Sequence, residues 1–210
     1  DAISGEWNVD FTGTFDIAPG TWVDSQQPDA DGDGTFYGVR IPNPYAQASV
    51  VHNWINAREW PNGTLMTLEV DDLSNGLGGV DYTTTATMAQ APWNPGDPND
   101  IVADFDISGF TLEAGDVVTV YGDMDGATVT KELTVSGLSV TSFDLGADTI
   151  SGVATPGADV EVCVNIPNAC VSRWVTADSV DGTWMVDYTG EHDLQPGDNG
   201  WTAEYDPDSD

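Results

Sequence analysis

Six aspartates in two groups of three are the side chains of this sequence best suited to bind a metal ion. They are Asp29, Asp31 and Asp33, in the run DADGDG, and Asp206, Asp208 and Asp210. Alternate carboxylates on a looped backbone can converge on one hard cation. The twelfth position from Asp29 is Arg40, where an EF-hand has a bidentate glutamate, so the motif is not an EF-hand. The sequence predicts Ca2+ at both groups with outside ligands; an acidic linker without metal is the alternative.

Catalytic chemistry has little support in the sequence. His52 lies in the strand-like run SVVHNWI and His192 in a turn, and neither adjoins a nucleophile motif such as G-x-S-x-G. The acidic residues are so numerous that any chosen carboxylate pair, as a glycosidase would need, is uninformative. We therefore predict no catalytic residue and a protein that is not an enzyme.

The two cysteines, Cys163 and Cys170, begin and end the run CVNIPNAC, at a spacing that could link the arms of a hairpin. A disulfide there would indicate an oxidising, extracellular location. Two buried free thiols are the alternative. No second Cys/His pair suggests zinc.

The charge of the chain restricts its partners. Four basic residues stand against 36 acidic ones, 28 of them aspartate, for a formal net charge of -32. Nucleic acid and anionic membranes would be repelled. The excess indicates an acidic coat suited to a saline habitat, bound divalent cations, or both. The sequence shows no signal peptide and no apolar run near 18 residues, so we expect a mature or excised piece without membrane insertion.

Eight tryptophans raise the question of a sugar-binding face, because exposed indole rings can stack on sugar rings. Alternation predicts core positions for Trp7, Trp174 and Trp184. The less constrained ones are Trp54, Trp60, Trp93 and Trp201, of which Trp60 and Trp93 adjoin prolines in expected loops. A carbohydrate-binding β-sandwich of a secreted or surface protein, with a glycan as partner, is therefore the alternative function.

The chain as a whole carries β signals. Short runs rich in Val, Thr and Tyr are divided by Gly, Pro, Asn and Asp, and no window shows helical spacing over three turns. The sequence predicts an all-β fold with two antiparallel β-sandwiches in tandem, residues 35–137, opening with FYGVRI, and residues 138–210. Residues 1–34 are predicted to be tail strands of a preceding or neighbouring module, with EWNVDFT as a half-buried strand.

Two dipeptides predict hairpin turns between strands, Asn62-Gly63 in WPNGTL and Asp125-Gly126 in GDMDGAT. The run AQAPWNPGDPND, with three prolines, cannot be a central strand. It is predicted to be an exposed loop.

The first 33 residues recur at the end of the chain at a constant offset of 177. Thirteen positions are identical, among them Gly5/Gly182, Trp7/Trp184, Val9/Val186, Asp10/Asp187, Gly13/Gly190 and Pro19-Gly20/Pro196-Gly197; Phe11/Tyr188 and Ile17/Leu194 are conservative exchanges. A fixed period is typical of repeat architectures. The N-terminal copy has no first half to pair with inside this chain, so it would expose apolar faces and backbone edges that invite another chain.

The segment DTISGVATPGADVEV, followed by VTADSVDGTWMVDY, a Pro-Gly turn and an acidic end, resembles the bacterial Ig-like repeats of large surface adhesins. The resemblance covers about residues 139–210 and rests on Gly152, Gly157, the turn 178–182 and Trp184; residues 1–33 are similar to the last strands of that module. It implies Ig-like sandwiches and a cation at the junction between modules. The Cys163 to Cys170 segment departs from the pattern, and residues 36–137 show a weaker likeness to companion sandwiches of tandem surface proteins.

These features together predict a structural unit of an extracellular filament, stalk or sheath, secreted or on the cell surface. Its partners would be copies of itself or adjacent repeats, joined head to tail by strand sharing or by continuation of the chain. A third arrangement packs residues 1–33 on the chain's own first sandwich.

Overall fold

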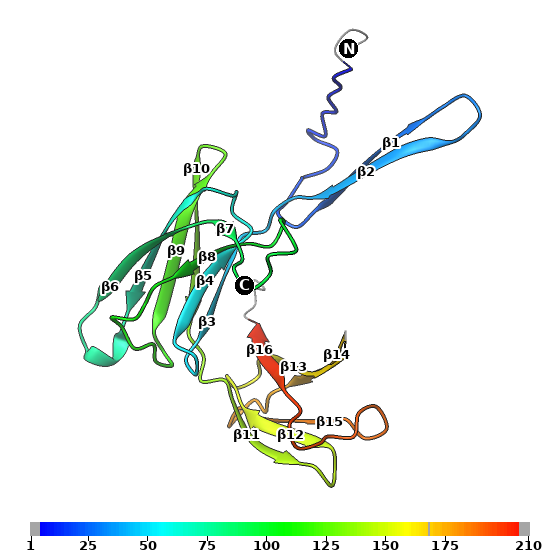
Figure 1. Cartoon of the computed structure of the whole chain (residues 1–210). Coiled ribbons are helices and arrows are strands. Elements are labelled where there is room, and N and C mark those ends of the chain that lie inside the picture. Colours follow the sequence, from blue (N-terminus) through cyan, green and yellow to red (C-terminus); the bar gives the residue numbers. More distant parts are fainter. Residues whose placement is uncertain (1–4, 168, 206–210) are drawn as a thin grey trace. The chain divides into compact units, whose positions relative to one another are not determined.

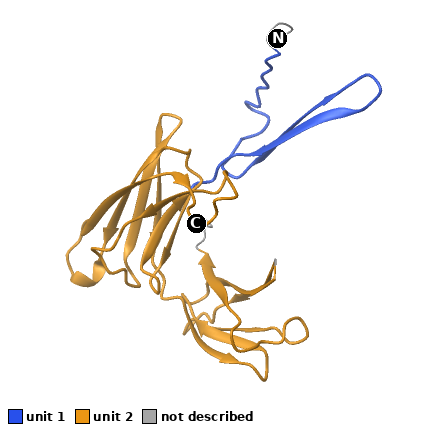
Figure 2. Cartoon of the chain, in the orientation of Figure 1, with its two compact units in different colours: residues 1–44 blue, residues 45–210 orange. Residues whose placement is uncertain are grey.

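A computed structural model describes residues 5–167 and 169–205. Over this range the fold is all-β, built from antiparallel sheets, with one 3-10 turn, η1 (Leu73–Asn75), as its helical content. None of the described residues belongs to a helix long and apolar enough to span a bilayer. The chain divides into two compact units, residues 1–44 and residues 45–210 (Figure 2).

The first β-sandwich begins at Tyr45. Its strands are β3 (Tyr45–Ser49), β4 (Trp54–Arg58), β5 (Leu65–Asp71), β6 (Tyr82–Thr87), β7 (Ala89–Gln90), β8 (Ile101–Phe105), β9 (Val117–Met124) and β10 (Ala127–Thr134). One sheet has the order β3-β4-β8-β7 and the other β10-β9-β5-β6 (Figure 1). The expected opening strand FYGVRI is not part of either sheet, because it pairs with the strand before it in the other unit.

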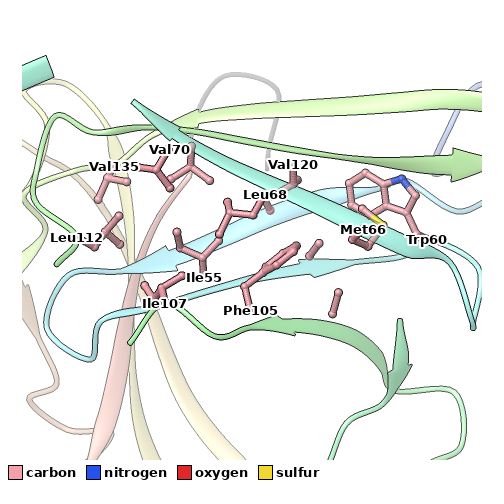
Figure 3. Close-up of a cluster of buried hydrophobic side chains, with 14 of the residues drawn as sticks. Ile55, Trp60, Met66, Leu68, Val70, Phe105, Ile107, Leu112, Val120 and Val135 are labelled. Atoms are coloured by element: carbon pink, nitrogen blue, oxygen red, sulfur yellow. The ribbon is translucent and has the colours of Figure 1, made fainter. Parts of the chain in front are cut away.

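Alternation along the central strands builds the core of this sandwich (Figure 3). Met66, Leu68 and Val70 of β5 are fully buried, and the residues between them are less so. Phe105, from the opposite sheet, belongs to the same cluster. Trp60, which the sequence placed in a loop, lies beside Met66 in this core. The loop assignment is right, but its indole fills the core rather than facing solvent.

The two predicted hairpin turns have different outcomes. Asp125 (φ 55°) and Gly126 (φ 85°) are both left-handed and connect β9 to β10 as a hairpin. Asn62-Gly63 also forms a turn, but β4 and β5 on either side of it belong to different sheets. The Gly63 N–H donates to the Met88 carbonyl at 2.8 Å. The hairpin prediction is wrong there, because the dipeptide fixes the local bend and not the sheet that the next strand joins.

Asp116 is a buried carboxylate of the first sandwich, and it should make stability fall with rising pH. Its Oδ2 accepts a hydrogen bond from the Glu113 N–H at 2.8 Å, but burial, the largest effect, raises its pKa. The folded state then binds the proton more tightly than the unfolded state, so stability is lost as pH rises from the ordinary pKa of 3.8 through the folded value. Asp116→Asn should lack this loss, and urea unfolding at several pH values measures it. A difference from the parent that stays constant with pH would contradict the assignment.

The second β-sandwich lies within residues 138–205. Its strands are β11 (Ser139–Asp144), β12 (Thr149–Val153), β13 (Asp159–Ile166), β14 (Ala169–Thr176), β15 (Thr183–Asp187) and β16 (Gly200–Tyr205), in sheets of order β11-β12-β15 and β14-β13-β16. Val160, Val162, Trp184 and Val186 lie in its core. Tyr188 is fully buried and donates its hydroxyl to the Val162 carbonyl at 2.8 Å. Burial raises the pKa of this phenol to about 12.

The N-terminal unit contains one hairpin, of β1 (Trp22–Pro28) and β2 (Gly34–Arg40), whose seven residue pairs run from Trp22↔Arg40 to Pro28↔Gly34. Residues 5–21 carry no strand, so the strand predicted in EWNVDFT is not formed. A strand requires a neighbour to complete its backbone hydrogen bonds, and none of the described strands takes that place. The boundary expected after residue 34 lies instead after Pro44, because β2 belongs with β1.

Candidate functional site

The repeated segment is the feature of the molecule from which a function can be argued. In the second sandwich its C-terminal copy includes β15 and β16. Subtracting the offset of 177 from β15 gives residues 6–10, and subtracting it from β16 gives residues 23–28, almost the bounds of β1. Residues 6–10 are thus the counterpart of β15, and β1 is the counterpart of β16.

The glycines at the turns of the two copies have the same backbone conformation. The φ angles are 72°, 74° and 81° at Gly5, Gly13 and Gly20, and 72°, 81° and 103° at Gly182, Gly190 and Gly197. All six are left-handed, a conformation that favours glycine. The N-terminal copy therefore bends at the same three places as the finished module.

The hydrogen bonds of the turn after the first strand are also repeated. Thr12 N–H donates to Asp10 Oδ1 at 2.8 Å, and Thr189 N–H donates to Asp187 Oδ1 at 2.8 Å. In both copies these threonine hydrogen bonds lower the pKa of the aspartate. The N–H of residue 15 bonds to the Phe11 carbonyl at 3.0 Å, as that of residue 192 bonds to the Tyr188 carbonyl at 3.1 Å. The local structure of this turn is therefore the same in the two copies.

The two copies differ in the solvent exposure of their apolar side chains. Core residues of the second sandwich have exposed counterparts in the N-terminal unit: Trp184 is 4% exposed and Trp7 70%, Val186 4% and Val9 56%, Tyr188 0% and Phe11 38%, Leu194 3% and Ile17 44%. The four exposed residues Trp7, Val9, Phe11 and Ile17 are called the apolar stripe below. The core position predicted for Trp184 is confirmed. That predicted for Trp7 is wrong for the described chain, because no described strand lies beside residues 6–10 as β12 lies beside β15.

The aspartates of DADGDG lie in the loop between β1 and β2. Asp29 Oδ1 accepts from the Asp31 N–H at 3.3 Å, and the Asp29 N–H donates to the Asp33 carbonyl at 2.7 Å. The carboxylates therefore shape a loop inside one hairpin instead of the expected junction between sandwiches. Asp206, Asp208 and Asp210 lie outside the described residues. Within residues 5–167 and 169–205, no group of three or more His, Cys, Asp or Glu side chains is arranged to hold a metal ion.

Calcium binding stays a prediction of the sequence. Extracellular modules bind Ca2+ at about 10⁻⁴ to 10⁻³ M, so calorimetric titration of the chelated protein should release or absorb heat in that range and raise its melting temperature. A titration to millimolar Ca2+ with neither effect would exclude the site.

Cys163 and Cys170 form a disulfide across the β13–β14 hairpin, with Cα atoms 5.8 Å apart. The sequence separation is 7, and closing a loop of that length stabilises a fold by about 2.5 kcal/mol in the chain-entropy model. Reduction should lower the melting temperature of the second sandwich and leave the first unchanged, as differential scanning calorimetry can resolve. A Cys163→Ser, Cys170→Ser variant should give the same thermogram with and without reductant. Equal melting of reduced and oxidised parent protein would contradict a stabilising role.

An aromatic cluster covers part of the outer face of the sheet β14-β13-β16. Trp174 stacks on Tyr205, with ring centroids 5.2 Å apart and an interplanar angle of 27°. The Tyr205 hydroxyl donates to Glu161 Oε2 at 3.0 Å, and the Ser172 hydroxyl donates to Glu161 Oε1. Trp201 lies across from Cys163 on the same face and is exposed.

Trp174 is exposed, so its predicted core position is wrong. On β14 the side chains that pack on the core are Val171 and Val175. Because side chains alternate along a strand, Trp174 must face outward. The sequence showed the alternation but not which of the two sets was buried.

Neither histidine lies in a strand. His52, expected in a strand, lies in the turn between β3 and β4, where its N–H donates to the Ser49 hydroxyl at 3.3 Å. His192 Nε2 lies 2.8 Å from Asp198 Oδ2, in the segment that leads into β16. This pair ties the segment into its turn conformation, a structural role that needs no substrate.

Comparison with known proteins adds no family to this description. No protein-family model matches the chain, and no curated protein is significantly similar to it. The fold and the repeated segment therefore define the class on their own: an all-β chain of antiparallel sheets whose N-terminal residues repeat the sequence of its C-terminal residues.

Proposed function

We propose that this chain is a non-catalytic structural repeat unit of an extracellular filament, stalk or sheath. The observation that carries the proposal is the contrast between the exposed apolar stripe and its buried counterparts in the second sandwich. The stripe has the turns of a finished module, and its side chains are exposed in the part of the chain that the structure describes. Burying each of its side chains would contribute about 1.5–3 kcal/mol. Association with a complementary half-module is therefore favourable.

The second sandwich defines that complementary partner. There β15 pairs with β12, and β16 pairs with β13. A half-module equivalent to residues 138–177 would supply these two strands to the N-terminal unit. It would lie earlier in the same polypeptide or in another copy of the chain.

Either arrangement joins modules head to tail. A head-to-tail contact generates a fibre when its rotation does not close into a ring. The disulfide fits an oxidising, extracellular location. The net charge of -32 would keep the fibres apart in solution.

A fusion tests the proposal directly. Placing a copy of residues 138–177 immediately before Asp1 restores the register of the repeat, since residue 178 is the counterpart of residue 1. We expect an additional cooperative unfolding transition and a blue-shifted, less quenchable Trp7 fluorescence, because the indole would enter a core.

The matched control carries Val9→Asp within the same fusion. A carboxylate buried against the added half-module should abolish the new transition, whereas Thr14→Asp, in the turn, should not. If the fusion leaves Trp7 accessible to quencher and shows no further transition, the tail assignment fails.

A second candidate function, glycan binding, is favoured by the aromatic cluster of Trp174, Tyr205 and Trp201. Trp174 and Trp201 are exposed, Tyr205 is partly buried beneath its stack with Trp174, and Glu161 and Ser172 supply polar groups beside them. Titration with neutral oligosaccharides should give a saturable change in tryptophan fluorescence that Trp174→Ala abolishes. Trp93→Ala is the control, because Trp93 is an exposed tryptophan of the other sandwich, where it lies 5.8 Å from the Arg58 guanidinium. If no sugar gives a saturable change, glycan binding is excluded and the structural role remains as the proposed function.

A further inference from the structure

We infer that the free edge of β16 is a docking site for a seventh strand of the second sandwich, and that its occupant is a second copy of β2, the strand GTFYGVR, carried by the next repeat. The inference rests on the proposed repeat architecture. It goes further, because it names the surface, the strand and the register that join one repeat to the next.

The N-terminal unit shows the pairing that β16 lacks. β1 is the counterpart of β16, and β1 pairs with β2 over its full length. β16 pairs with β13 along one edge, and no described strand pairs with its other edge. Carrying the β1–β2 register over by the offset of 177 places a second Tyr37 opposite Thr202 and a second Val39 opposite Gly200.

The cross-strand rows show where these two side chains would point. Thr202 lies opposite Val162, and Gly200 lies opposite Val164, and both valines are buried in the core. Residues opposite one another on neighbouring strands face the same side of a sheet. The docked Tyr37 and Val39 would therefore extend two rows of core residues. In the N-terminal unit, where the described residues form a single two-stranded sheet, they are 69% and 43% exposed.

The facing sheet supplies an independent observation. Phe143 pairs with Ile150, and Val140 with Gly152, so both lie on the side of β11 that faces the core. Phe143 is nevertheless 66% exposed and Val140 38%. Core-facing side chains with this exposure indicate that the sandwich is open along β11, where a further strand of the facing sheet could cover them.

The unpaired edge of β16 lies on the same side of the sandwich as the exposed side chains of β11. β14 packs against β15 on one side of the sandwich, and β11 and β16 are the edge strands of the opposite side (Figure 1). A strand added beside β16 would therefore extend its sheet past β11 on the open side of the sandwich, where its Tyr37 and Val39 would pack beside Phe143. The order β14-β13-β16 would become a four-stranded sheet facing β11-β12-β15.

The test appends a copy of residues 34–44 directly after Asp210 in the otherwise unchanged full chain. Residues 206–210 are then the sequence counterparts of residues 29–33, which connect β1 to β2. Hydrogen exchange of the β16 amides that point away from β13 should slow by about tenfold or more, and the melting temperature of the second sandwich should rise.

Two substitutions in the appended copy separate docking from a general effect of extension. Tyr37→Asp should abolish both gains, because it places a carboxylate in the core. Phe36→Asp, whose side chain would face outward, should preserve them. Phe143→Ala in the chain itself should reduce the gain in melting temperature.

Unchanged exchange and unchanged melting on extension would overturn the inference, and so would equal effects of the two aspartate substitutions. The N-terminal unit is untouched in this experiment. If the fusion before Asp1 shows the additional unfolding transition and this extension has no effect, the proposed repeat unit is supported and the docking of a seventh strand on β16 is excluded. If only the extension has the expected effect, the docking of β2 on β16 is supported, and the proposed association of the apolar stripe with a half-module is contradicted.

Discussion

Trp184→Ala should lower the free energy of unfolding of the second sandwich by about 3–5 kcal/mol, the range for removing a large buried aromatic side chain. Trp184 is almost fully buried among Ile150, Val160 and the other core residues. Its loss would leave a cavity that the surrounding strands, fixed by pairing on both sides of β12, cannot fill. Chemical denaturation followed by circular dichroism measures the difference.

Trp7→Ala is the matched substitution, at the same position of the repeat. Because Trp7 is exposed in the described chain, its removal should change stability by less than about 0.5 kcal/mol. In the fusion with a copy of residues 138–177 ahead of Asp1, the same substitution should become as costly as Trp184→Ala. Equal effects of Trp7→Ala with and without the added half-module would contradict the proposed assembly.

Gly152→Ala should prevent the second sandwich from folding, or destabilise it by more than about 3 kcal/mol, since overpacking a rigid core at a single methyl already costs 1–3 kcal/mol. A Cβ at Gly152 would lie inside contact distance of the Ser139 carbonyl oxygen and of the Trp184 indole. Neither neighbour can withdraw, because Ser139 pairs with Val153 in the same sheet and the indole is enclosed by the core.

Gly146→Ala is the control for that substitution. It lies in the loop between β11 and β12, and the atom nearest to an added Cβ is Asp144 Oδ1 at 3.5 Å, an ordinary contact. Its effect on melting should be small. The first sandwich should melt at its usual temperature in both variants, and calorimetry distinguishes the two transitions. A Gly152→Ala protein with both transitions intact would show that the contact with Trp184 is not as close as described.

The sequence was sufficient for those features that depend on period and on turn chemistry. Alternation predicted the β-fold, and the offset of 177 identified β15 and β16 as the counterparts of residues that precede β2. Asp125-Gly126 forms its hairpin because both residues accept the left-handed conformation that the turn requires. These features are local, so the identity of a few neighbouring residues determines them.

The errors concern which face of a strand is covered and which strands become neighbours. Alternation predicted core positions for both Trp174 and Trp184, but one lies on the outer face of its sheet and the other inside. SVVHNWI was expected to be one strand and contains the turn between β3 and β4. FYGVRI was assigned to the first sandwich, although it pairs with β1. Each outcome depends on contacts between segments far apart in the chain, which a single sequence does not display.

The turn from Asp10 to Gly20 keeps its hydrogen bonds and its left-handed glycines although no sandwich surrounds it. The bonds among residues 10–15 connect residues at most four positions apart, and closing such short loops takes well under a microsecond. During synthesis the corresponding turn of each module would therefore be in place before the strands that flank it find their sheets. The slow step in building an array would be the docking of a finished tail onto an open half-module, and a chain interrupted at that step would expose the surface most prone to aggregation.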